Sequence, residues 1–205
     1  MTTDSLREKK RRATAHALAQ AAFDLALERG VDGFTIDEVA TRAGYSRRTF
    51  ANHYAGKEEA IAAVATEQVR HALAEDVDEG LPRLEWLHAV ALKQLSGGLP
   101  AGLRDLRTLA EGHPALLPHV LEVQRLIREA ALDAVLARTT SPIGRVNAHL
   151  LVGAAYGALS GVLDGKIPVR LNPSTDHDSD ANGSITLTSF LDLTFTKLRR
   201  GFSPN

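Results

Sequence analysis

The stretch FTIDEVATRAGYSRRTFANHYAGKEEAI, Phe34 to Ile61, carries the signals for three helices in close succession. It opens with Thr35-Ile36-Asp37-Glu38, a capping box in which the threonine hydroxyl caps a helix and the glutamate reaches back to the threonine amide. Gly44 is placed to end this helix after about nine residues. Ser46 can then cap the next helix. Two short helices joined by a tight, glycine-containing turn predict a helix-turn-helix unit.

Further helices are predicted on both sides of this unit, and strands are not. In chain order, helices are expected near residues 10–29, 35–43, 46–54, 57–76, 83–96, 102–112, 115–138, 143–164 and 185–200. Glycines and prolines punctuate the chain between them. Valine, isoleucine and threonine do not alternate with polar residues over any useful length, so the sequence predicts no strands. The polar segment 167–184, rich in turn-forming residues, is expected to be a mobile loop.

The predicted fold class is all-α, with an N-terminal three-helix domain that holds the helix-turn-helix unit in residues 1–57 and a larger C-terminal helical domain in residues 58–205. Charge is divided unevenly between them. Residues 1–57 hold 10 basic and 7 acidic residues, a net +3, whereas the remainder carries −4 and the whole chain −1. A mildly basic N-terminal quarter on an acidic body favours a local electrostatic footprint. Chance is the alternative, because this excess is modest.

Composition and motifs argue against several classes of protein. The chain has no cysteine, which excludes disulfides, thiolate metal sites and a cysteine nucleophile. There is no apolar signal-peptide region, and the longest apolar stretch, 150–163, is too short to span a bilayer, so we expect a cytoplasmic protein that does not contact membranes. No P-loop, Gly-x-Ser-x-Gly or Gly-x-Gly-x-x-Gly motif is present, so we expect neither an enzyme nor a cofactor.

No metal site is expected. His113 and His119 flank a proline-containing turn and lack the i, i+4 spacing of a helical ligand pair. The HDSD segment at 177–180 could bind a cation, but a solvated loop explains it better.

The helix after the turn has basic residues where a DNA-reading helix needs them. The candidates are Ser46, Arg47, Arg48, Thr49 and Asn52. The serine is the N-cap, and the next three residues form the first turn. A recognition helix reads the major groove with its N-terminal residues; arginine can donate twice to guanine, and asparagine can pair with adenine. Two arginines at a helix N-terminus oppose the helix dipole, which is a hint of function. The alternative is an ordinary solvated helix start.

The order of these elements resembles the N-terminal DNA-binding domain of the TetR (tetracycline repressor) family. A long helix, a capped short helix, Ala-Gly-aromatic-Ser, an Arg-Arg-Thr-Phe helix and Tyr-x-Gly-Lys-Glu follow one another, over roughly Arg12 to Val64. The resemblance implies that the matching residues meet DNA, namely Thr35, Arg47, Arg48, Thr49, His53, Tyr54 and Lys57. By the same resemblance, the residues that would bind phosphates are Thr35, His53, Tyr54 and Lys57. Ala51 departs from the family pattern, which usually has an aromatic residue there, so base reading would depend more on the arginines and Asn52.

Several of these residues also have structural alternatives. Thr35 could act as a cap alone, Tyr54 could belong to the core, and Lys57 could be a solvated lysine. The segment REKKRR, Arg7 to Arg12, sits just before the expected first helix. It could follow the DNA backbone or enter a minor groove as an arm, or it could be a disordered charged tail. Nonspecific attraction to phosphates is expected in either case.

The resemblance implies a homodimer and a ligand pocket in the C-terminal domain. The last two long helices would form the dimer bundle, with interface candidates Gly153, Gly157, Gly161, Leu187, Phe190, Leu191 and Leu198. Glycines four apart allow close helix packing, which could equally lie within one subunit. The pocket candidates are Trp86, Val90, Leu103, Leu106, Leu109, Leu117, Val120, Val123 and Tyr156. Packing in the core is the alternative for each of them, and an apolar lining would suit a hydrophobic effector.

The function expected from this sequence is that of a one-component transcriptional regulator. It would be a repressor, released from double-stranded, palindromic operator DNA by a small-molecule ligand. An activator or architectural binder with the same fold is a close alternative. A helical enzyme or ligand carrier is the alternative from another class, although the sequence offers no nucleophile–base pair.

Overall fold

The computed structural model describes residues 6–73, 80–96, 99–170 and 185–200. The chain divides into two compact units, one made of residues up to 67 with 102–123, and one made of 68–101 with 124 onward. The predicted boundary between residues 57 and 58 therefore differs from this division. The first turns of the helix that begins at Lys57 carry Ile61 and Val64, which are buried residues of the first unit. A sequence pattern shows that such residues are buried, but not in which core.

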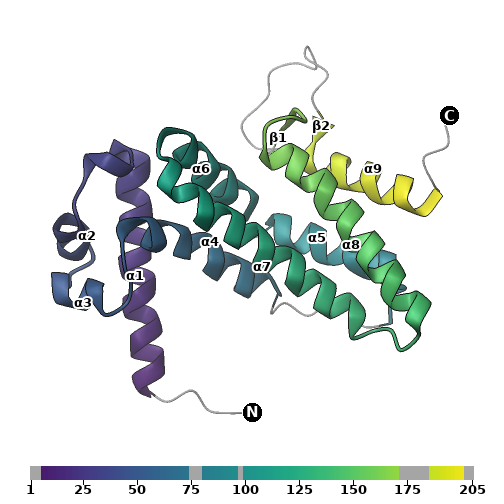
Figure 1. Ribbon diagram of the computed structural model, residues 1–205, viewed down its shortest axis with the longest axis horizontal. Coiled ribbons are helices and arrows are strands. Elements are labelled where there is room, and N and C mark those ends of the chain that lie inside the picture. Colours follow the sequence, from purple (N-terminus) through teal and green to yellow (C-terminus); the bar gives the residue numbers. More distant parts are fainter. Residues whose placement is uncertain (1–5, 74–79, 97–98, 171–184, 201–205) are drawn as a thin grey trace. The chain divides into compact units, whose positions relative to one another are not determined.

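The first unit begins with a helix-turn-helix arrangement. Its elements are α1 (Leu6–Arg29), η1 (Val31–Gly33), α2 (Ile36–Arg42), α3 (Arg47–Ala51), the start of α4 (Lys57–Leu73), most of α6 (Leu99–Gly112), η2 (Pro114–Leu116) and the start of α7 (Leu117–Leu136). α1 packs against η1 and α2, and α2 packs against α3 (Figure 1). The buried side chains include Leu18, Phe23, Leu25, Phe34, Val39, Phe50 and Ile61. Burial of these apolar faces stabilises the three short elements, which are too short to persist alone.

The second unit is built around the C-terminal helix. Its further elements are α5 (Arg83–Ser96), α8 (Pro142–Leu163), β1 (Val169–Arg170), β2 (Ile185–Thr186) and α9 (Leu187–Arg200). α9 packs against α5, α8 and both strands (Figure 1). The core includes Trp86, Leu87, Val90, Ala131, Val135, Val152, Phe190 and Phe195. The ring of His88 stacks on that of Phe195 with centroids 4.6 Å apart.

The all-α class is confirmed, although several details differ: α3 ends at Ala51 and not at residue 54, and α6 begins at Leu99 and not at residue 102. α1 begins at Leu6, four residues before the predicted start, because the intervening residues are good helix formers. The prediction of no strands is wrong in one place, where two-residue strands pair in parallel with Val169 opposite Ile185. Residues 171–184, most of the predicted loop 167–184, lie outside the described residues. Within the described ranges, no helix is both long and apolar enough to cross a bilayer.

Candidate nucleic-acid interface

The predicted capping box forms at the start of α2. The Thr35 hydroxyl oxygen accepts from the Glu38 amide at 3.3 Å, and the Glu38 carboxylate accepts from the Thr35 amide at 2.8 Å and from its hydroxyl at 3.0 Å. These hydrogen bonds, first of all that from the Thr35 backbone, lower the pKa of Glu38. Both partners of the Thr35 hydroxyl are thus within the cap, which fits the structural alternative for this residue.

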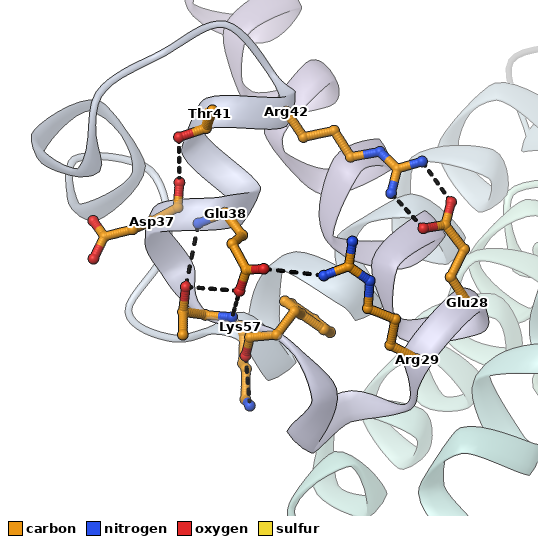
Figure 2. A network of polar contacts seen from close by, with 9 residues as sticks. Glu28, Arg29, Asp37, Glu38, Thr41, Arg42 and Lys57 are labelled. Carbon is orange, nitrogen blue, oxygen red and sulfur yellow. Dashed lines mark hydrogen bonds and ion pairs between the residues drawn. The ribbon is translucent and has the colours of Figure 1, made fainter.

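Two ion pairs fasten the cap and its helix to the end of α1 (Figure 2). Arg29 Nη1 donates to Glu38 Oε1 at 3.0 Å, and Arg42 donates through both Nη atoms to Glu28, one bond being 2.7 Å long. The bond from Arg42 is the main reason why the pKa of Glu28 is lowered. The pairs are exposed, so each contributes little to stability, but together they restrain how α2 lies against α1.

The turn between α2 and α3 is a Schellman motif. The Gly44 amide donates to the Thr41 carbonyl at 3.1 Å, and the Tyr45 amide donates to the Ala40 carbonyl at 2.8 Å. Gly44 has φ +77°, in the left-handed region that other residues adopt only at a cost. The turn therefore needs glycine here, and it sets the direction in which α3 leaves.

Ser46 caps α3 as predicted. Its Oγ accepts from the Thr49 amide at 3.1 Å and lies 2.9 Å from the Thr49 hydroxyl. Phe50 is buried and anchors the helix, its ring centroid 5.7 Å from that of Tyr54. These contacts leave Arg47 and Arg48 exposed in the first turn of α3 and Asn52 exposed at its C-cap.

The two arginines differ in their surroundings. Arg47 Nη1 donates to Asp37 Oδ2 at 2.7 Å, although both side chains are largely exposed, at 67% and 60%. Arg48 forms no ion pair within the residues that the structure describes. Sequence reasoning placed Asp37 only in the capping box, because a pairing across ten residues and a turn leaves no periodic signal. Figure 2 shows the Asp37 carboxylate pointing away from that of Glu38.

The end of α3 is tied back to α1. The Tyr54 hydroxyl donates to the Ala15 carbonyl at 2.9 Å and is partly buried. His53 is half-buried beside it, and burial, followed by the charge of Arg11, lowers the pKa of the His53 ring. Tyr54 therefore has a structural partner, and His53 is close enough to Arg11 for the two charges to interact.

Lys57 lies differently from the predicted phosphate contact. Its ammonium donates to the Val31 carbonyl at 2.6 Å and to the Phe34 carbonyl at 3.4 Å, and lies 3.9 Å from the Asp32 carboxylate. It also lies 5.2 Å from the centre of the Phe34 ring. The side chain is only 21% exposed. Lys57 is thus not the solvated lysine of the structural alternative, because its ammonium joins α4 to η1.

The basic segment 7–12 is helical, so the predicted arm before the first helix is wrong in its conformation. The exposed cations of this segment include Arg7, Lys9, Lys10 and Arg11, in the first turns of α1. Near them, the Thr14 hydroxyl lies 3.4 Å from the hydroxyl of Tyr45, which is exposed in the turn before α3. Arg11 belongs to the segment that was considered as a DNA-contacting arm, whereas Tyr45 was not singled out in the sequence. The signal that could have drawn attention to Tyr45 is the presence of a large aromatic residue in the short turn between two helices.

The pocket candidates fall in both units, each described separately. Leu103, Leu106, Val120 and Val123 are buried in the first unit, where Leu109 is half-buried and Leu117 is 40% exposed. Trp86, Val90 and Tyr156 belong to the core of the second unit. Burial raises the pKa of the Tyr156 hydroxyl above its ordinary value. Leu117 at the start of α7 is thus not a buried wall, because its face of the helix is solvated.

Several candidates for the dimer interface pack within the subunit. Leu187, Phe190 and Leu191 are buried and Leu198 is half-buried in the core of their own unit. At Gly161 an added Cβ would lie 2.8 Å from Ile167 Cδ1, so this glycine serves packing within the subunit. Leu187, Phe190 and Leu191 are thus core positions of the subunit, because the apolar face of α9 packs on α5 and α8. Gly153 and Gly157 remain exposed.

No group of three or more histidine, aspartate or glutamate side chains within the described parts could hold a metal ion. The HDSD segment at 177–180 lies outside those parts.

Comparisons with known proteins agree with this geometry. Residues 18–64 match the family model described as bacterial regulatory proteins, tetR family. A solved transcriptional regulator from Rhodococcus sp. RHA1 is 24% identical, with 93% of this chain and 99% of that chain covered and a TM-score of 0.52. A solved TetR transcriptional regulator from the same organism is 21% identical, with 94% and 98% covered and a TM-score of 0.54. A TetR/AcrR-family regulator from Thermobifida fusca is 16% identical, with 96% and 100% covered and a TM-score of 0.52. No curated protein matches the chain.

At these identities the solved structures establish the fold of the whole chain, and the family match covers the helix-turn-helix unit. That unit presents two arginines at the start of a serine-capped, anchored helix. Residues 18–64 therefore match the DNA-binding domain of the tetR family of bacterial regulatory proteins, and the chain as a whole shares the fold of solved transcriptional regulators.

Proposed function

We propose that the protein is a homodimeric repressor that binds a palindromic operator and is released by a small hydrophobic molecule. The observation that supports it best is the exposure of Arg47 and Arg48 at the start of α3. The Schellman turn before α3 and the Tyr54 hydrogen bond after it restrain the helix, so little ordering is left for DNA binding to impose. Each subunit would place α3 in the major groove of one half-site.

An open apolar face on α8 supports the dimer. Its members are Ile143, Val146, Leu150, Gly153, Ala154 and Gly157, all exposed and spaced to lie on one side of the helix. A Cβ added at either glycine would meet nothing within 4 Å in the subunit. Such a face suits the backbone of a second copy, and a two-fold dimer would present two α3 helices to a palindrome.

The second unit supports a ligand site in the helical body. Trp86, Val90 and Tyr156 cluster there, and the guanidinium of Arg138 lies 4.1 Å from the centre of the Trp86 ring. A ligand would release DNA only through a difference in affinity between the binding and non-binding states of the dimer. An activator would use the same DNA contacts, and transcription from a template with the operator placed over a promoter distinguishes the two.

Selection of the purified protein on a random DNA pool tests the proposal. Two double variants are compared with the wild type. The first, Arg47→Ala/Arg48→Ala, removes two positive charges from the start of α3. The second, Arg128→Ala/Arg145→Ala, is the control and removes two positive charges from exposed positions on α7 and α8. We expect the wild type and the second variant to enrich one inverted repeat and the first variant to enrich none. Enrichment of a single half-site would contradict the dimer, and no enrichment at low salt would contradict the operator-binding role.

A further inference from the structure

We propose that Asp37 is a specificity-determining residue, which positions Arg47 for reading a base. This inference rests on the proposed function and deepens it. The pair joins the first turn of α2 to the first turn of α3 through the 2.7 Å bond from Arg47 Nη1 to Asp37 Oδ2. No other group in the described residues holds the Asp37 carboxylate.

The Asp37 carboxylate lies where its negative charge should weaken DNA binding, so we look for an interaction that offsets this cost. Asp37 is 60% exposed beside the helix that would enter the groove, where a negative charge repels phosphates. Its neighbour Glu38 is committed to the cap and to Arg29. Asp37 is not needed for that cap, because the capping box uses Thr35 and Glu38 alone. Besides its favourable place in the first turn of α2, the interaction that its side chain makes within the described residues is the bond to Arg47.

The bond leaves Arg47 able to read a base. A guanidinium has five N–H donors in a planar fork, and the Asp37 bond uses one Nη atom. The other donors stay available for guanine O6 and N7, the acceptors that arginine reads with two bonds. Holding one end of a long side chain also removes rotamers before DNA arrives, so less conformational entropy is lost on binding.

Arg48 provides the internal comparison. It follows Arg47 directly, is also exposed, and forms no ion pair in the described part of the chain. A free, flexible arginine suits a phosphate, whose acceptors can be approached from many directions. The structure thus divides the two roles, with Arg47 oriented for a base and Arg48 left to bind the backbone.

The test measures equilibrium binding of the full-length protein to the selected operator, to operators changed at one base pair at a time, and to a random duplex. The variants are Asp37→Ala, Arg47→Ala and the two combined. Glu111→Gln is the control, since it removes one exposed negative charge at the end of α6. Circular dichroism confirms that each variant is folded.

We expect Asp37→Ala to lose about tenfold of the discrimination at one base pair, the same position at which Arg47→Ala loses it. Affinity for the random duplex should stay equal or rise. In the Arg47→Ala background, removal of Asp37 should change the discrimination no further, and Glu111→Gln should change none of it.

Two results would overturn the inference. The first is a gain in affinity for every duplex that persists when Arg47 is absent, which would make Asp37 only a bulk charge. The second is unchanged discrimination in Asp37→Ala while the wild type remains selective. A wild type that selects no sequence would instead overturn the proposed function, together with the inference that rests on it.

Discussion

The hydroxyl of Tyr54 donates a 2.9 Å hydrogen bond to the carbonyl oxygen of Ala15, 39 residues earlier in the chain. The acceptor is in the middle of α1, and the donor lies just past α3. A side chain thus connects the residues just past α3 to the long first helix, and this bond restrains α3 together with the turn that precedes it.

Replacing Tyr54 by phenylalanine should weaken folding and leave DNA binding largely intact. The loss of a single hydrogen bond predicts a fall of about 0.5–1.5 kcal/mol in the free energy of unfolding, measured by urea titration. The ring contact with Phe50 is kept, so the core should persist. Operator affinity measured well below the melting temperature is the control. A tenfold weaker affinity at unchanged stability would assign the hydroxyl to a phosphate.

Thr35→Ala should lower the free energy of unfolding by about 1 kcal/mol, since an N-cap without a hydroxyl leaves the Glu38 amide unpaired. Thr35→Ser keeps the hydroxyl and should restore most of the loss. Thermal melts of the three proteins at one concentration compare them. Equal melting temperatures for the alanine and serine variants would show that the threonine methyl, and not the cap, matters.

Gly44→Ala should cost about 1–2 kcal/mol of stability, because a side chain is strained at φ +77° even where there is space for it. Gly112→Ala is the matched control, since a Cβ there also meets nothing within 4 Å but φ is not positive. Chemical denaturation should separate the two variants. A stable Gly44→Ala protein would mean that the turn can rearrange, and the direction of α3 with it.

DNA affinity should rise as the pH falls from about 8 to 6, and His53 should be responsible. Burial and Arg11 lower the pKa of the ring, so His53 is neutral in the free protein at neutral pH. A phosphate beside it favours the charged form, so DNA binding would take up a proton. His53→Gln should flatten this dependence. An equal slope in the variant would assign it to another group.

The same shift predicts the opposite sign for folding. The unfolded chain has the higher His53 pKa, near 6.5, and binds more protons between the two values. The free energy of unfolding should therefore be highest above pH 6.5, where His53 is neutral in both states, and should decrease as the pH falls toward the lower pKa of the folded protein. Urea titrations of the wild type and His53→Gln at several pH values measure this difference.

Leu150→Glu should convert a dimer into monomers. Leu150 is 67% exposed in the subunit and central on the open face of α8, so a charge there would be buried without a partner at the interface, weakening association by about 2–4 kcal/mol. Sedimentation velocity measures the change. Leu27→Glu, at an exposed leucine of α1, is the control and should stay dimeric. A wild type that sediments as a monomer would contradict the proposed dimer.

Local signals carried most of what the sequence could predict. The Thr35 cap, the Gly44 turn and the Ser46 cap each depend on residues within a few positions of one another, and all three form as expected. The contacts that were missed join distant elements. Nothing in the pattern around Lys57 distinguishes a lysine facing phosphate from one that binds the Val31 carbonyl.

The apolar residues of α8 and α9 illustrate the same limit. Leu187 and Leu150 are both leucines on amphipathic helices, yet the first is 4% exposed and the second 67%. Periodicity identifies apolar faces, but which of two such faces packs on the subunit's own core depends on the arrangement of α5, α8 and α9. That arrangement is a tertiary property, so the sequence pattern alone does not show which of these leucines is buried within the subunit.

The imidazole of His113 lies between two carboxylates, with Nδ1 3.2 Å from Asp32 and Nε2 3.2 Å from Glu58. One carboxylate belongs to η1 and the other to the first turn of α4, while the histidine directly follows α6. Because the imidazole ring is rigid, the distance between its two nitrogens is fixed. A displacement of the end of α6 would therefore change both contacts together, so His113 couples this helix end to η1, which precedes α2, and to the start of α4.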